Sequence, residues 1–146
     1  ASMIESAVKP LIDSDDINIS NLYTKIRDLE SFEDPNEVKV VMDDKEFAMY
    51  FSREPIPSRK KGIVDVPMFK QVCVIPFRRD FLIRYNEMNQ SPLEIIESVD
   101  MMRILENGLK IKMVYISEDN CSVDTKEDLK KVTLLMKKDK LINKYM

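Results

Sequence analysis

The sequence predicts an α/β domain with a mixed, mostly parallel sheet and helices on both faces. Segments with the two-residue period or the continuous apolar character of strands alternate with segments that carry helical caps and helical spacing. The chain has 146 residues, a length that suits one domain. Hydrophobic residues make up 44% of it and charged residues 34%, a balance that permits a substantial core. The fold expectation rests on these three observations.

The first half of the chain is predicted to hold one helix and three strands. The helical spacing i, i+3, i+4, i+7 is met by Ile4, Ala7, Val8 and Leu11. Pro10 is expected to end or kink that helix. Residues 19–26 are ambiguous and favour a strand over a helix. Residues 37–43 and 47–52 are rich in β-branched and aromatic residues and are expected to form a hairpin. A long loop with a basic centre follows, and such loops are usually functional or mobile.

The second half is predicted to alternate strands with helices. The apolar run 69–77 suits a strand that is covered on both faces. Asp80 is expected to cap a short helix after that run. Residues 109–116 alternate in polarity and indicate another strand. Thr125 then caps a last helix, whose apolar stripe consists of Leu129, Val132 and Met136.

Residues 92–106 carry the clearest helix signals of the chain. Ser91 and Glu94 have the spacing of a capping box, and Pro92 occupies the first helical position. Gly108 follows the last turn, where a left-handed conformation commonly ends a helix. The apolar residues of this segment fall on more than one side of the predicted helix. We therefore expect one continuous central helix that packs on several sides.

The composition excludes several kinds of site. The chain contains no histidine, which removes a Ser-His-Asp triad, a Cys-His pair and most transition-metal sites. Its two glycines, Gly62 and Gly108, are too few for a phosphate-binding loop. The two cysteines indicate a reducing compartment. A net charge of −3 argues against nucleic acid or an anionic membrane as a partner. With no signal-peptide pattern or spanning segment in the sequence, a cytoplasmic location is expected.

Three positions carry polar residues that could support chemistry. Asp124, before the last helix, could hold Mg²⁺ through oxygen, or could simply belong to a helix-cap turn. Arg53, at the end of a strand, could bind a carboxylate or phosphate, or could be an exposed loop arginine. Glu94 and Glu97 lie within one helical turn and could bind a polyol or a metal. The alternative for this pair is a structural role, since Glu94 completes the capping box.

These motifs occur in an order that resembles a known family. They are Val38 to Asp43, Tyr50 to Arg53 with Ile56-Pro57, Ser91 to Glu94 with Glu97, Arg103 to Leu105, and Val123 to Leu129. In this order they resemble the C-terminal half of 3-deoxy-manno-octulosonate cytidylyltransferases, the CMP-KDO synthetases of lipopolysaccharide biosynthesis. The chain is similar, more distantly, to acylneuraminate cytidylyltransferases. The resemblance runs from about Met3 to Leu135.

The resemblance implies a Rossmann-like nucleotidyltransferase fold and a homodimer. It implies that CTP and a 2-keto-3-deoxy sugar acid give a CMP-sugar and pyrophosphate, with Mg²⁺ bridging triphosphate and sugar. Asp124 matches the magnesium carboxylate of the family's C-terminal part. Arg53, Gln71, Glu94 and Glu97 match positions near the sugar. The hairpin and the loop at residues 50–56 correspond to the region that pairs subunits.

The sequence also departs from the family. The family has histidine where this chain has Gln71 and commonly glycine where it has Ser122, which leaves the acidic sugar open. The family's N-terminal half, with its CTP loop and a second magnesium aspartate, has no counterpart in these 146 residues. We therefore expect an incomplete domain over residues 1–146 with no CTP turnover of its own, forming a homodimer or a strand-exchanged oligomer. The alternative is a non-catalytic interaction module derived from that fold.

Overall fold

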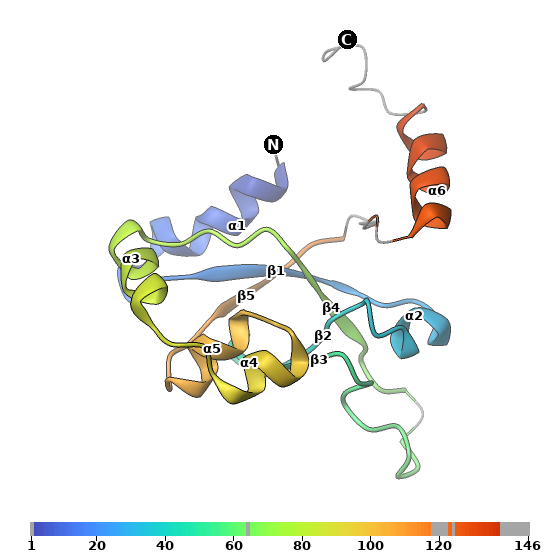
Figure 1. Cartoon of the computed structure of the whole chain (residues 1–146), viewed down its shortest axis with the longest axis horizontal. Coiled ribbons are helices and arrows are strands. Elements are labelled where there is room, and N and C mark those ends of the chain that lie inside the picture. The colour runs from blue at the N-terminus through green and yellow to red at the C-terminus, as the bar shows by residue number, and fades with distance from the viewer. Residues whose placement is uncertain (1, 64, 118–122, 124, 138–146) are drawn as a thin grey trace.

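The computed structural model describes residues 2–63, 65–117, 123 and 125–137 (Figure 1). This part of the chain contains both helices and strands, as the sequence predicts. In chain order they are α1 (Ser2–Asp13), β1 (Ser20–Lys25), α2 (Leu29–Glu33), β2 (Lys39–Met42), β3 (Ala48–Ser52), β4 (Phe69–Val72), α3 (Arg79–Glu87), α4 (Pro92–Glu97), α5 (Met101–Glu106), β5 (Lys112–Tyr115) and α6 (Lys126–Met136).

The sheet has the strand order β3-β2-β4-β1-β5. It is mixed, as expected, but the expectation of mostly parallel strands is wrong. Among the described strands β1 and β5 pair in parallel, whereas β1 with β4, β2 with β3 and β2 with β4 pair antiparallel. A hairpin joined by a short turn must be antiparallel. The expectation that residues 69–77 form one strand covered on both faces is also wrong, because β4 ends at Val72, only Val72 of its four residues is buried, and Cys73 is exposed.

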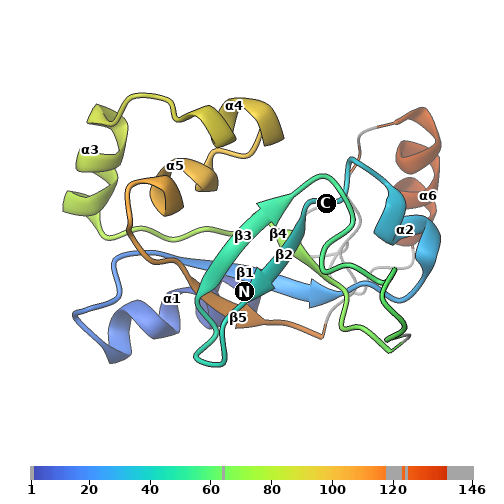
Figure 2. The ribbon, with the colours of Figure 1, turned by 90° about the horizontal axis from the view of Figure 1, so that it is seen from below.

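The two outer strands of the sheet contact each other. Phe47 and Lys112 form an antiparallel bridge. On either side of it the Ala48 N–H donates to the Ile111 carbonyl at 3.0 Å, and the Met113 N–H donates to the Glu46 carbonyl at 2.8 Å. The β2–β3 hairpin therefore curls across β5 (Figure 2). Edge groups that a strand-exchanged oligomer would use at these positions are already bonded within the chain.

Helices cover both faces of the sheet, as the sequence predicts. In Figure 2 α3, α4 and α5 lie on one side of the strands and α1 lies on the other. The larger core lies under α3 to α5 and includes Tyr23, Phe51, Tyr85, Met102, Ile104 and Met113. A smaller cluster lies under α1 and consists of Ala7, Leu22, Val72 and Ile116.

The expected central helix over residues 92–106 is wrong, because the segment is two helices. Ser98 has φ 51° and ψ 47°, the left-handed conformation that ends α4, and α5 begins at Met101. Ile95 and Ile96 on α4 are 63% and 74% exposed, so this part of the segment does not pack on several sides. The break turns α5 onto β3, where Met102 and Ile104 are buried.

Other local predictions have mixed outcomes. Thr125 caps α6 as expected, since its Oγ1 accepts from the Asp128 N–H at 3.1 Å. The expected cap at Asp80 is wrong, because α3 begins at Arg79 with Arg78 as its N-cap. Helix α1 continues through Pro10 to Asp13. The short helix α2 was not predicted, although Asp28 caps it by accepting from the Ser31 N–H at 2.8 Å.

Candidate functional site

Arg53 fastens the end of β3 to the end of α4. Its guanidinium donates to three backbone carbonyls: from Nε to Glu97 at 2.7 Å, from Nη2 to Ser98 at 3.0 Å and from Nη1 to Pro35 at 2.8 Å. Two of these carbonyls belong to the C-terminal end of a helix, where a cation is favourable. The fork predicted for a bound carboxylate or phosphate is therefore occupied by main-chain oxygens in this structure.

Glu97 lies on the helix side of the same junction between β3 and α4, which we call the Arg53 corner. Its carboxylate accepts from the Arg53 N–H at 2.8 Å, from the Tyr50 hydroxyl at 3.0 Å and from Ser52 Oγ at 3.2 Å. Burial and then the hydrogen bond to Glu97 raise the pKa of Tyr50 above its ordinary value. Arg53 and Glu97, both predicted site residues, are thus brought together, and they join α4 to β3.

Glu94 points to a different partner from Glu97. It is 6% exposed and accepts a bidentate pair from Arg103, at 2.7 Å from Nε and 2.5 Å from Nη2. Hydrogen bonding from Arg103 holds the pKa of Glu94 below its ordinary value of 4.5. The Arg103 guanidinium also lies 4.6 Å from the centre of the Tyr85 ring. This ion pair links α3, α4 and α5. The predicted capping-box contact is also present, from the Ser91 N–H to Glu94 at 3.2 Å.

Gln71 lies on the central strands, apart from the Arg53 corner. Its Nε2 donates to Asn21 Oδ1 at 2.6 Å, and Asn21 Nδ2 donates to the Val72 carbonyl at 2.7 Å. In the strand register Gln71 is opposite Tyr23, whose ring meets Tyr115 and Phe69 edge-on. The structure therefore gives Gln71 a polar neighbour within an aromatic region. No hydrogen bond is described between it and the other predicted site residues.

Asp124, the predicted magnesium ligand, lies outside the described residues. The expectation that Asp124 and Arg53 open onto one hollow therefore stays a prediction. Among the residues that the structure describes, no cluster of three or more His, Cys, Asp or Glu side chains could hold a metal ion. In the described ranges no helix has the length and apolar character needed to cross a bilayer.

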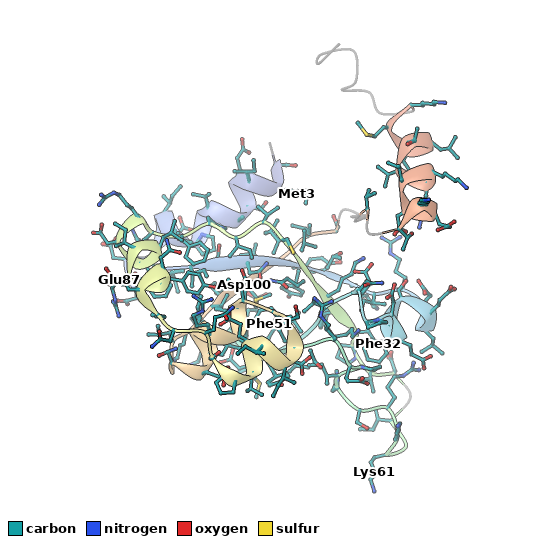
Figure 3. The ribbon with its side chains drawn as sticks, in the orientation of Figure 1. Met3, Phe32, Phe51, Lys61, Glu87 and Asp100 are labelled. Carbon is teal, nitrogen blue, oxygen red and sulfur yellow. The ribbon has the colours of Figure 1, made fainter. Side chains whose placement is uncertain are left out.

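An open hollow of about 690 Å³ lies beside the Arg53 corner, between α2 and the loop after β3. The loop carries Lys61 at its far end (Figure 3). Acidic, basic and apolar groups all face the hollow, whose lining residues are Leu29, Phe32, Glu33, Glu54, Pro55, Pro57, Ser58, Arg59 and Lys60. Sequence reasoning identified the loop as functional or mobile but missed α2, which forms the opposite wall.

Lys39 is a buried cation that the sequence analysis missed. Its side chain is fully buried, and Nζ donates to the Asp34 carbonyl at 2.8 Å. Burial lowers the pKa of Lys39 below its ordinary value of 10.5, against the attraction of nearby carboxylates. Lys39 and Arg53 together hold the two consecutive carbonyls of Asp34 and Pro35. A lysine between Val38 and Val40 in a strand was the available signal.

Comparisons with known proteins agree with this arrangement. A family model described as cytidylyltransferase matches residues 1–111. The chain is 41% identical over 134 residues to a 3-deoxy-manno-octulosonate cytidylyltransferase of Solibacter usitatus, covering 92% of this chain and 53% of the relative. It is 38% identical over 140 residues to the enzyme of that name from Fusobacterium nucleatum, covering 95% of this chain and 56% of the relative.

A solved structure gives the same result. The chain superposes with a TM-score of 0.84 and 30% identity on CMP:2-keto-3-deoxy-manno-octonic acid synthetase complexed with CTP. The superposition covers 93% of this chain and 56% of the synthetase. The chain thus spans about half the length of the relatives that it matches. From the extent of the family match and the identity to these relatives, the chain belongs to the cytidylyltransferase family.

Proposed function

We propose that this chain is the sugar-binding and dimerising half of a cytidylyltransferase that joins CTP to a 2-keto-3-deoxy sugar acid, and that it corresponds to the C-terminal half of that enzyme. The observation that carries the proposal is the superposition, with a TM-score of 0.84, on about half of a synthetase for CMP-2-keto-3-deoxy-manno-octonic acid. The names of the relatives from Solibacter and Fusobacterium support the same substrate class.

In this proposal the polar residues of the chain bind and orient the sugar acid. Gln71 has an amide on the central strands, and its unused hydrogen-bonding capacity suits a hydroxyl or carboxylate. Arg53, Glu94 and Glu97 are assigned to the sugar by resemblance. Because all three already bond to protein groups, we infer that a ligand would share the half-buried side chains of Arg53 and Glu97, whereas the buried Glu94 would act through Arg103.

The chemistry of the complete enzyme needs groups from both halves. Asp124 is assigned to Mg²⁺, which prefers oxygen ligands and would neutralise charge on the triphosphate when bound. We propose that a second carboxylate and the CTP-binding loop come from the other half, so that this chain alone releases no pyrophosphate. We also propose that the complete enzyme acts in the cytoplasm as a homodimer. Bonding between the two outer strands favours dimerisation through faces or loops over strand exchange.

Two measurements test the proposal. With CTP, Mg²⁺ and 3-deoxy-manno-octulosonate, the chain alone is expected to release no pyrophosphate, and clear turnover would refute its assignment as a partial enzyme. In calorimetry the chain is expected to bind the sugar acid but not a neutral ketose of similar size. Gln71→Glu should weaken that binding by about tenfold, because a like charge then faces the ligand. The control is Asn86→Asp on the exposed side of α3, which should bind as the wild type does.

A second candidate function is a non-catalytic interaction module that has kept the fold. The observation that favours it is the presence of two glycines in 146 residues, since a phosphate-binding loop needs several close together. The same calorimetry separates the two functions. A folded chain that binds neither the sugar acid nor the ketose would favour the module.

A further inference from the structure

Helix α6 lies apart from α1, α3, α4 and α5 and from most of the sheet, on the side of the molecule that carries α2 (Figures 1 and 2). None of its residues is buried. Its apolar side chains are instead more than half exposed at Leu129 (56%), Leu134 (61%), Leu135 (55%) and Met136 (54%). An isolated helix shorter than about 12–15 residues is marginal in water, and α6 has 11. Such a helix gains most of its stability from packing, so this one needs a partner surface.

The apolar residues of α6 fall mainly on one face. With 3.6 residues per turn, Leu129, Val132 and Met136 lie close together along the helix, and Leu135 lies beside them. We call these four residues the α6 stripe. Leu134 lies about 140° around the helix from Leu129 and therefore faces away from the stripe. A partner that recognises the stripe would leave Leu134 outside the contact.

The comparison with the solved synthetase indicates what the partner is. Residues from Lys126 onward number 21 of 146, more than the 7% of the chain left outside the superposition. The superposition therefore extends into α6. The same superposition leaves 44% of the synthetase without a counterpart in this chain. The helix of the synthetase that corresponds to α6 therefore belongs to a longer polypeptide. That additional polypeptide can supply the surface against which α6 would pack.

We propose that the α6 stripe is the docking surface for the complementary half of the cytidylyltransferase, whether that half is joined to this chain or separate. This inference rests on the proposed function, because it takes the occupant from the same enzyme. The surface fits an apolar patch on a folded α/β polypeptide rather than a charged ligand, since the stripe carries no charge. Docking would bury the α6 stripe and slow amide exchange along the helix.

Co-expression tests the proposal with defined partners. The whole chain is produced together with the part of the Solibacter relative that lies outside the matched 134 residues, and in parallel with the corresponding part of the Fusobacterium relative. Co-expression lets the partner fold on this chain. A one-to-one complex is expected, with amide hydrogen exchange in α6 slowed at least tenfold relative to the chain alone.

Paired variants assign the effect to the stripe. Leu129→Lys with Met136→Lys should abolish the complex and the protection of α6. Leu134→Lys, on the same helix and 61% exposed, should leave both unchanged. No complex with either partner, or a complex that the stripe variants leave intact, would overturn the inference. Sugar-acid binding by the chain alone is measured without α6 contacts, so its loss would count against the proposed function and not against the docking surface.

Discussion

Arg53 and Glu97 contact each other twice, through opposite kinds of group. The Arg53 backbone N–H donates to the Glu97 carboxylate at 2.8 Å, and the Arg53 side-chain Nε donates to the Glu97 backbone carbonyl at 2.7 Å. Backbone and side chain of each residue are therefore both engaged with the other. This reciprocal contact holds the end of β3 against the end of α4. It lies at the start of the loop that lines the hollow.

Arg53→Lys should weaken this corner although it keeps the positive charge. A lysine ammonium has no planar fork and cannot reach the carbonyls of Pro35, Glu97 and Ser98 together. We expect the free energy of unfolding in urea to fall by about 1–3 kcal/mol. Arg79→Lys, where the side chain is 84% exposed, is the control and should change it by less than about 0.5 kcal/mol. Equal stability of the two variants would show that the carbonyl contacts contribute nothing.

Met102→Leu tests a sulfur acceptor at the edge of the sheet. The Phe51 N–H of β3 donates to Met102 Sδ at 3.4 Å, and both residues are almost fully buried. Leucine fills a similar volume but leaves that amide without an acceptor. Met101→Leu is the matched control, since Met101 is also 1% exposed and makes no such bond in the described structure. We expect Met102→Leu to cost about 1 kcal/mol more than the control in urea unfolding. Equal costs would contradict a structural role for the sulfur.

Glu94→Gln should reduce the acid sensitivity of the fold. Because Arg103 lowers the pKa of Glu94 in the folded chain, the ionised form stabilises the fold above 4.5, its ordinary value. That contribution is lost as the pH falls from 4.5 through the lower folded pKa. The variant should therefore be less stable near neutral pH, by about 2 kcal/mol, and its stability should depend less on pH in the acid range. Urea titrations at a series of pH values measure both effects. The exposed control Glu87→Gln should keep the wild-type slope, and an equally flat slope in that control would remove Glu94 as the cause.

Elements with local signals could be predicted from the sequence. The hairpin over residues 37–52 and the Thr125 cap of α6 depend on turn residues and side chains within a few positions of each other. The division between α4 and α5 could not be predicted in this way. The left-handed Ser98 is held by Arg53, which lies 45 positions earlier and donates to the Ser98 carbonyl. Distant contacts also decide that β4 pairs antiparallel with β1 and β2.

The candidate site was predictable in its residue types but not in its partners. Arg53, Glu94 and Glu97 were identified as polar groups at a strand end and on one helical turn. The sequence did not show that Glu94 would pair with Arg103 or that Arg53 would donate to main-chain carbonyls. Both pairings depend on how the helices pack against one another and the sheet. Lys39 was missed for a related reason. Its Nζ donates to the Asp34 carbonyl, a contact that the strand pattern of residues 37–43 does not reveal.

Lys39→Met should remove an increase in stability on the alkaline side. Burial lowers the pKa of Lys39 in the folded chain, so between that lower value and 10.5 the unfolded chain binds more protons than the folded chain. Stability therefore rises with pH across this window, because the folded chain no longer carries a buried charge. Below the window the charge opposes folding, and a methionine of similar volume should leave stability near neutral pH unchanged or slightly higher. Lys25→Met, at an exposed position of β1, should keep the wild-type rise. Urea unfolding at several pH values up to 10.5 checks the difference between the two variants. Identical pH profiles would show that the Lys39 ammonium is not the group responsible.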